Sequence, residues 1–186
     1  MHDLIALTAL GGANPETCTI GSVTCSEVPD VALASVAARL GREGETHSAL
    51  AALIGQKAPG IGQFSGQTLI AFWAGPEQWI VEAPFESHEG LAELVKDGTK
   101  DAASVSEQTD AWARFDLKGP DVQSVLELLC NLDCRNLATG GAARTSIHHL
   151  VCFLLRRSTD LFSIYAPRSS AQSLQHAIVT AMKSAF

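Results

Sequence analysis

The sequence lacks most of the features by which a functional class is recognised. Its 13 Lys and Arg stand against 20 Asp and Glu, giving a net charge of −7, and no basic cluster interrupts that balance. Nucleic acid and anionic membrane surfaces are therefore unsuitable partners. The apolar segment at residues 4–10 is far shorter than the roughly 20 residues of a membrane-spanning helix. It lacks the basic start of a signal peptide, so we expect an arm that packs on this protein or on a neighbour.

Paired cysteine motifs are also absent, and the cysteine pattern argues against two kinds of site. There are five cysteines, an odd number, and none forms a C-x-x-C pair, which argues against a disulfide framework and against a metal site. We expect free thiols that act as small core residues, with Cys130 and Cys134 as buried neighbours on a helix face. Free thiols predict a reducing compartment, most simply the cytoplasm.

The motifs that come closest to a site each fail one requirement. Residues 60–65 nearly match a dinucleotide-binding fingerprint, but Ser65 replaces the third glycine and a strand follows, so we predict a loop. His148 and His149 are adjacent on a predicted strand and would point to opposite faces, so they cannot chelate one ion. Neither Ser65 nor Ser106 lies in the elbow motif of a serine nucleophile.

The remaining polar and aromatic candidates favour structural roles. Asp110, Asp116 and Asp133 are predicted at a strand start, on the solvent side of that strand and at a helix exit, where carboxylates are usually solvated or capping. The tryptophans are expected in the core or in hairpin pairs, with a partner-facing anchor as the alternative. These tryptophans are Trp73, Trp79 and Trp112. No self-sufficient active site is visible.

The strongest positive feature is an internal repeat. Residues 79–84 form an apolar strand that ends at Ala-Pro and is followed by Ser87 and a helical run, and residues 162–167 repeat this pattern before Ser169. We predict an α+β fold with mainly antiparallel sheet, built from duplicated strand-helix-strand-strand-helix units. The predicted organisation is a single domain over 1–186 with pseudo-repeats at about 17–101 and 102–186.

The periodicity along the chain predicts about nine strands and five helices. Leu33, Val36, Ala37 and Leu40 have helical spacing and predict a helix over 30–41. The other main elements are a hairpin at 67–83, a strand at 111–117, a helix that Pro120 opens, a hairpin over 145–166, and a last helix capped at Ser169.

Two segments resemble a known family. Residues 105–121, VSEQTDAWARFDLKGPD, and the helix expected over 122–133 are similar to the tetrahydrofolate-binding aminomethyltransferase-like family. Within it, residues 73–81, WAGPEQWIV, and residues 161–169, LFSIYAPRS, most resemble the gamma subunits of heterotetrameric sarcosine oxidases. The resemblance covers roughly residues 66–186, and the implied fold is that of the N-terminal part of the folate-binding enzymes.

The resemblance implies a non-catalytic subunit of a cytoplasmic oxidoreductase complex with alpha, beta and delta partners. Such a complex oxidatively demethylates sarcosine to glycine, with hydrogen peroxide and formaldehyde or methylene-tetrahydrofolate as the other products. FAD, FMN, NAD and tetrahydrofolate are expected on the other subunits and none on this chain. The strand at 149–155 has no acidic residues leading into it, unlike that of the folate-using enzymes, which supports this reading.

The expected partner is mainly the folate domain of the alpha subunit. We expect the interface at Leu4 and Leu7 of the arm and around Trp112 and Arg114, although Trp112 is also a candidate for the chain's own core. Two alternatives stay open at this point: an autonomous folate-dependent one-carbon transferase, and a free-standing homo-oligomeric binding protein that shares only the fold.

Overall fold

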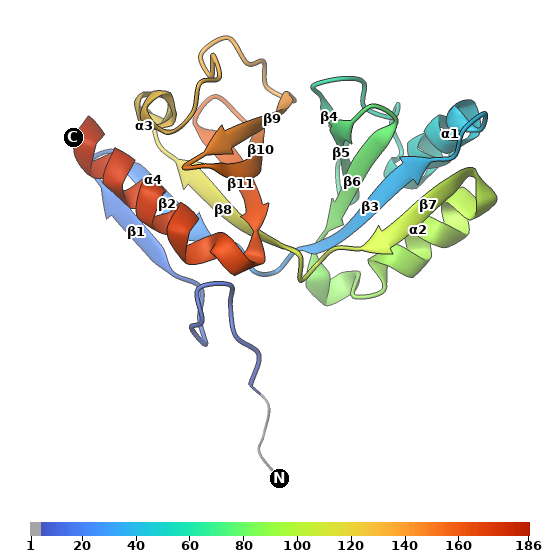
Figure 1. Ribbon diagram of the computed structural model, residues 1–186, viewed down its shortest axis with the longest axis horizontal. Helices are drawn as coiled ribbons and strands as arrows, with labels where there is room; N and C mark the ends of the chain where they lie inside the picture. Colours follow the sequence, from blue (N-terminus) through green and yellow to red (C-terminus); the bar gives the residue numbers. More distant parts are fainter. Residues whose placement is uncertain (1–4) are drawn as a thin grey trace. The chain divides into compact units, whose positions relative to one another are not determined.

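The computed structural model describes residues 5–186 and divides into two compact units (Figure 1). Unit 1 comprises residues 5–29, 110–139 and 144–186, and unit 2 comprises residues 30–109 and 140–143. Each unit contains one antiparallel sheet with two α-helices on one face. The fold class is therefore α+β, as the sequence predicts.

Unit 2 is built on a five-stranded sheet in the order β4-β5-β6-β3-β7, with every neighbouring pair antiparallel. Its strands are β3 (Ala32–Ala38), β4 (Phe64–Gly66), β5 (Ile70–Gly75), β6 (Gln78–Ala83) and β7 (Ala103–Glu107). Helices α1 (Glu43–Ile54) and α2 (Leu91–Thr99) bury Leu50 and Val95 against Ala34 and Val81. Short 3-10 turns η1 (Phe85–Ser87) and η2 (Lys100–Ala102) flank α2.

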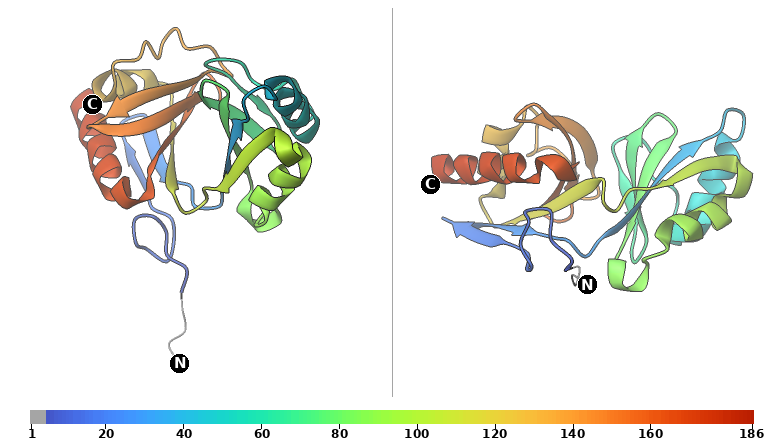
Figure 2. Two further views of the ribbon diagram at one scale, coloured as in Figure 1. Left: turned by 45° about the vertical axis from the view of Figure 1, so that its right-hand side comes forward. Right: turned by 60° about the horizontal axis from the view of Figure 1, so that its bottom comes forward.

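Unit 1 is built on a six-stranded sheet in the order β1-β2-β8-β11-β10-β9. Its strands are β1 (Thr17–Ile20), β2 (Val23–Glu27), β8 (Trp112–Lys118), β9 (Ala142–Ile147, of which residues 144–147 belong to unit 1), β10 (Leu150–Arg156) and β11 (Leu161–Pro167). The helices are α3 (Val122–Leu129) and α4 (Ala171–Ala185), the latter preceded by η3 (Arg168–Ser170). Figure 2 shows α4 lying along the sheet.

The core of unit 1 lies between the sheet and its helices. Ala113, Phe115 and Leu117 alternate along β8 and are all buried, together with Leu174 and Ile178 of α4. Burying one large apolar side chain contributes about 1.5–3 kcal/mol to stability. This alternation of period two is therefore the pattern that attaches the helices to the sheet.

The two units share one order of elements. In unit 2 the order is β3-α1-β4-β5-β6-α2, and in unit 1 it is β8-α3-β9-β10-β11-α4. The sheet orders correspond as well, with β4-β5-β6-β3 in one and β9-β10-β11-β8 in the other. Both β6 and β11 lead through an Ala-Pro pair and a 3-10 turn into a helix. Each copy contains one strand more than the sequence pattern predicts.

The strand added beside each copy comes from a different place in the chain. In unit 2, β7 follows α2 and pairs with β3, whereas in unit 1, β2 precedes the whole copy and pairs with the equivalent strand β8. The compact units are therefore interleaved in sequence. The repeat boundaries at about 17–101 and 102–186 stay a prediction.

The helix predicted over 30–41 is wrong, because this segment is the strand β3. Ala34 and Val36 face the helices of unit 2, while Leu33 is 2% exposed on the other side of the strand and Leu40 is 97% exposed. A central strand that is buried on both faces shows no alternation. The helical spacing of the apolar residues between Leu33 and Leu40 is therefore a coincidence.

Two smaller predictions are also wrong. His148 and His149 do not lie on a strand: they form the two-residue turn between β9 and β10, with φ of 48° and 67°. Ser87 and Ser169 lie in 3-10 turns, so α2 begins at Leu91 and α4 begins after Ser170, neither with a side-chain cap. The Ala-Pro pair, rather than a serine cap, precedes both helices.

Candidate functional site

The N-terminal arm is anchored to unit 1 at Leu10. That side chain is 8% exposed in the core, whereas Leu7 is 55% exposed. The Leu7 carbonyl oxygen accepts a hydrogen bond from Arg168 Nη2 at 2.8 Å. Of the arm residues predicted to face a partner, Leu7 has an apolar side chain that is exposed to solvent. Leu4 lies outside the described residues.

A buried carboxylate holds the base of the arm. Glu27 is 5% exposed, and its two oxygens accept hydrogen bonds from the backbone N–H groups of Leu10 (3.0 Å) and Glu16 (3.2 Å). A buried charge is stable only where donors surround it, and these two backbone donors satisfy both oxygens. Glu27 is thus the acceptor around which the arm turns into β1.

Trp112 and Arg114 lie on the face of β8 that points away from α3 and α4. They alternate with Ala113 and Phe115, which pack on the helices. The Trp112 ring is half-buried, and its centroid lies 5.1 Å from that of Phe153 in a tilted arrangement. Such a pair contributes about 0.5–1.5 kcal/mol beyond the buried area, so Trp112 has a role within unit 1.

A polar network occupies the same face of the sheet. Arg114 forms a bidentate pair with Asp116, with both N···O distances at 2.8 Å. The Ser163 hydroxyl donates to Asp116 at 2.7 Å and accepts from Arg157 Nε at 3.0 Å. Arg157 Nη2 also donates to the Tyr165 hydroxyl at 3.1 Å. Ser163 and Tyr165 are fully buried although they face away from the helices.

The hydrogen bonds of this network stabilise the fold. Ser163 is held between a carboxylate and a guanidinium, and its proton is committed to Asp116, which is itself paired with Arg114. No histidine reaches this serine among the hydrogen bonds of residues 5–186, so it lacks the activated base of a serine nucleophile. Satisfied networks of this kind fix the register of neighbouring strands, here β8 and β11.

The three aspartates named from the sequence do not form a catalytic cluster. Asp116 belongs to this network, whereas Asp133 accepts hydrogen bonds from Asn136 in the loop after α3. Asp110 instead lines a shallow polar hollow with Arg168. Residues 60–63 form a loop, as predicted, whereas Phe64 and Ser65 already belong to β4, and no helix follows directly. No group of three or more metal-binding side chains occurs within residues 5–186.

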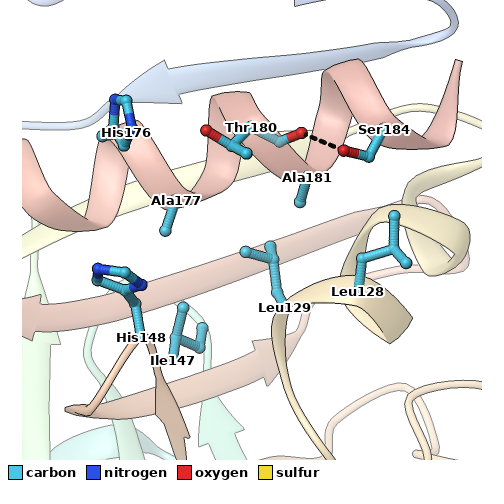
Figure 3. A pocket seen from close by; sticks show the side chains of 9 residues that line it. All are labelled: Leu128, Leu129, Ile147, His148, His176, Ala177, Thr180, Ala181 and Ser184. Atoms are coloured by element: carbon cyan, nitrogen blue, oxygen red, sulfur yellow. Dashed lines mark hydrogen bonds between the residues drawn. The ribbon is translucent and has the colours of Figure 1, made fainter.

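A shallow groove of about 420 Å³ lies between α3, α4 and the turn after β9 (Figure 3). Its wall on α3 is Leu128 and Leu129, and Leu128 is 57% exposed. His148 and His176 stand at the other end of the groove. The groove is not apparent from the sequence, because its residues come from three separate segments.

No helix in the described part of the chain is both long and apolar enough to cross a membrane. No protein-family model matches the sequence, and no curated protein is significantly similar to it. Solved structures, however, share its fold. These similarities therefore rest on topology and not on conserved sequence.

A structure of heterotetrameric sarcosine oxidase from Corynebacterium sp. U-96, in complex with pyrrole 2-carboxylate, contains a chain with a TM-score of 0.79 and 23% identity to this one. The match covers 91% of this chain and 88% of that chain. Glycine cleavage system aminomethyltransferase T from Bartonella henselae matches with a TM-score of 0.65 and 16% identity over 87% of this chain. That match spans only 46% of the aminomethyltransferase.

The chain therefore has an aminomethyltransferase-like fold, as the resemblance of residues 105–133 predicts. The sarcosine oxidase chain has that fold at a length close to this chain's own, whereas the transferase is about twice as long as the matched region.

Proposed function

We propose that this chain is the gamma-type subunit of a heterotetrameric sarcosine oxidase. In this proposal it carries no active site and no cofactor, and it packs against the folate domain of the alpha subunit in a cytoplasmic complex. The beta and delta subunits complete the complex, which converts sarcosine to glycine with hydrogen peroxide and formaldehyde or methylene-tetrahydrofolate. FAD, FMN, NAD and tetrahydrofolate bind to the other subunits.

The observation that carries the proposal is the near full-length match to a sarcosine oxidase chain, at 91% and 88% coverage. The sealed polar network supports the non-catalytic part of it, because Ser163 and Asp116 are engaged with each other and with arginines. The exposed apolar arm supports the subunit role, since Ile5 is 73% and Leu7 is 55% exposed. Leu4, Trp112 and Arg114 complete the proposed interface.

The test is to express the alpha, beta and delta chains from the same source with and without this chain. The proposal predicts that soluble, flavin-containing alpha subunit falls several-fold when this chain is omitted, because the surface it covers is exposed. Equal yields of active, flavin-loaded complex in both cases would contradict the subunit role.

The second candidate, an autonomous folate-dependent one-carbon transferase, rests on the match to aminomethyltransferase T. It predicts that tetrahydrofolate quenches the tryptophan fluorescence of the isolated chain, with Trp79 and Trp112 as reporters. Saturable quenching would favour this candidate, and unchanged fluorescence would remove it.

A further inference from the structure

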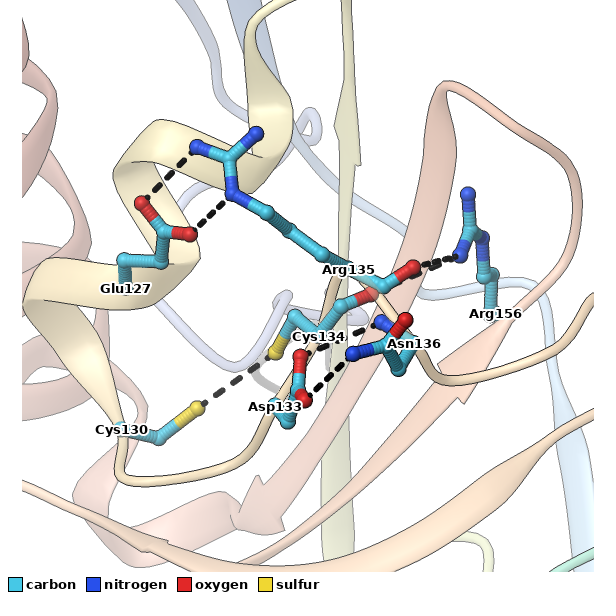
Figure 4. A network of polar contacts seen from close by, with 7 residues as sticks. All are labelled: Glu127, Cys130, Asp133, Cys134, Arg135, Asn136 and Arg156. Carbon is cyan, nitrogen blue, oxygen red and sulfur yellow. Dashed lines mark hydrogen bonds and ion pairs between the residues drawn. The ribbon is translucent and has the colours of Figure 1, made fainter.

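Two cysteines meet at the end of α3. The helix ends at Leu129, and the next residue, Cys130, has extended backbone angles of −145° and 162°. The chain then turns back and brings Cys134 Sγ to 3.9 Å from Cys130 Sγ (Figure 4). The sequence predicts these residues on one helix face, but only Cys130 adjoins the helix and Cys134 lies in the loop.

Two sets of contacts hold the loop that carries Cys134, one from Arg156 of β10 and one from Glu127 of α3. Arg156 Nη1 donates to the carbonyl oxygens of Arg135 at 3.1 Å and Leu137 at 2.5 Å. Arg135 in turn forms an ion pair with Glu127 of α3. The two sulfurs are therefore held 3.9 Å apart in a loop that side-chain contacts keep in place.

The surroundings of the two thiols shift their pKa values in opposite directions. The pKa of Cys130 is lowered to about 6, first by its hydrogen bond with Cys134, and further by the Leu132 backbone N–H and the Thr145 hydroxyl, against the opposing effect of burial. Thr145 Oγ1 is buried and forms no hydrogen bond of ordinary geometry among the described residues. The pKa of Cys134 is raised, because its proton is shared with the Cys130 thiolate and because it is buried. Cys130 is half-buried, whereas Cys134 is 1% exposed.

We propose that Cys130 and Cys134 form a peroxide-oxidisable dithiol, in which Cys130 is the attacking residue and Cys134 the resolving residue. The Cys130 thiolate attacks one oxygen of a hydroperoxide, the O–O bond breaks, and Cys130 becomes a sulfenic acid while the other oxygen leaves as hydroxide or alkoxide. Cys134 sulfur then displaces the hydroxyl of the sulfenic acid, its proton leaves with that hydroxyl as water, and an S–S bond forms. Two thiols are oxidised and one peroxide is reduced.

The geometry suits this step. The two sulfurs are 3.9 Å apart and must approach to the about 2.05 Å of a disulfide bond. The resulting bond would tie the end of α3 to the loop that Arg156 holds. The proposal is independent of the subunit role, although a sarcosine oxidase would generate peroxide close by.

The same unit contains an internal control. Cys18 and Cys25 are directly opposite each other on β1 and β2, so they too are neighbours. Burial, however, raises the pKa of Cys25 to about 12, with smaller contributions from the charges of Cys18 and Asp116. Cys152, which is also buried, has its pKa raised to about 11. A buried thiol with a raised pKa reacts slowly with peroxide.

The test is to treat the intact, folded chain with stoichiometric hydrogen peroxide at pH 7 and to map disulfides by mass spectrometry. We expect the 130–134 linkage to form on the order of tenfold faster than any linkage of Cys18 with Cys25. The same treatment in urea should abolish the preference. Equal rates in the folded chain, or five free thiols after treatment, would overturn the proposal.

Single variants identify the two roles. Cys134→Ser should halt at a sulfenic acid on Cys130 that a dimedone-type reagent traps, whereas Cys130→Ser should leave Cys134 unmodified. Trapping at Cys134 in the Cys130→Ser variant would contradict the assigned order. The wild-type map needs no substitution and decides the linkage itself if a variant fails to fold.

Discussion

The Ser163 hydroxyl oxygen lies 2.7 Å from an oxygen of Asp116, on the neighbouring strand and 47 residues away in the sequence. This contact joins β11 to β8 on the face that the helices do not cover. The Ser163 hydroxyl hydrogen is therefore engaged with Asp116.

Removing the Ser163 hydroxyl should destabilise the fold and should not affect catalysis. In Ser163→Ala, Asp116 and Arg157 each lose a buried partner, so we expect a loss of about 1–3 kcal/mol in the free energy of unfolding. Urea denaturation followed by circular dichroism measures it. The control Ser184→Ala removes an exposed hydroxyl bonded to Thr180 and should change stability by less than about 0.5 kcal/mol. Equal effects for the two variants would show that the network carries no stability.

Glu27 should control the order of the arm. In Glu27→Ala the backbone N–H groups of Leu10 and Glu16 lose their acceptor, so their hydrogen exchange should accelerate at least tenfold and the arm should become sensitive to proteases. The exposed Glu89 supplies the control Glu89→Ala, which should leave exchange at both amides unchanged. Unaltered protection of Leu10 in the Glu27 variant would mean that core packing alone holds the arm.

The turn between β9 and β10 is a site for stabilisation. His148 and His149 both have positive φ, a conformation that suits Asn-Gly in a two-residue hairpin turn. Replacing the pair by Asn-Gly should raise the free energy of unfolding by about 1 kcal/mol, because the left-handed strain is relieved. Thermal unfolding measures the gain. A lower midpoint would indicate that the histidine rings stabilise the groove beside α4.

The rate at which the Cys130 thiol is alkylated should depend on pH as its pKa predicts. Because this pKa is lowered to about 6, alkylation of Cys130 should fall as the pH decreases through 6 and should be nearly constant from pH 7 to 9. Asp133 and Glu127 are the charged groups that act on Cys134, and Cys130 in turn raises the pKa of Cys152. Cys25 and Cys152 should stay unmodified over this range, since their pKa values are raised. A rate that increases steadily up to pH 9 would contradict the assignment.

The arm should contribute to partner binding if the proposed function holds. Replacing Ile5 and Leu7 together by Ser removes exposed apolar surface and should weaken association with the alpha subunit by about tenfold or more. Leu40→Ser is the matched control, because Leu40 is 97% exposed in unit 2. Binding is measured by titration calorimetry or by interferometry. Similar affinities for both variants would move the interface away from the arm.

The sequence predicts those parts of the fold whose signals are local. The alternation of Ala113, Phe115 and Leu117 and the Ala-Pro pairs after residues 82 and 165 each lie within one segment, and the structure confirms the elements they predict. The sequence does not reveal strand β3, because burial on both faces removes the alternation. The network of Ser163 and Tyr165 was missed because its partners meet only when β8 and β11 pair.

The most direct test of the subunit proposal is size-exclusion chromatography of this chain co-expressed with the alpha, beta and delta chains, followed by flavin absorbance. We predict that this chain elutes with the other three in equal amounts, within a flavin-containing peak that forms hydrogen peroxide from sarcosine. Elution of this chain alone, while the other three form an active flavin complex, would contradict the account.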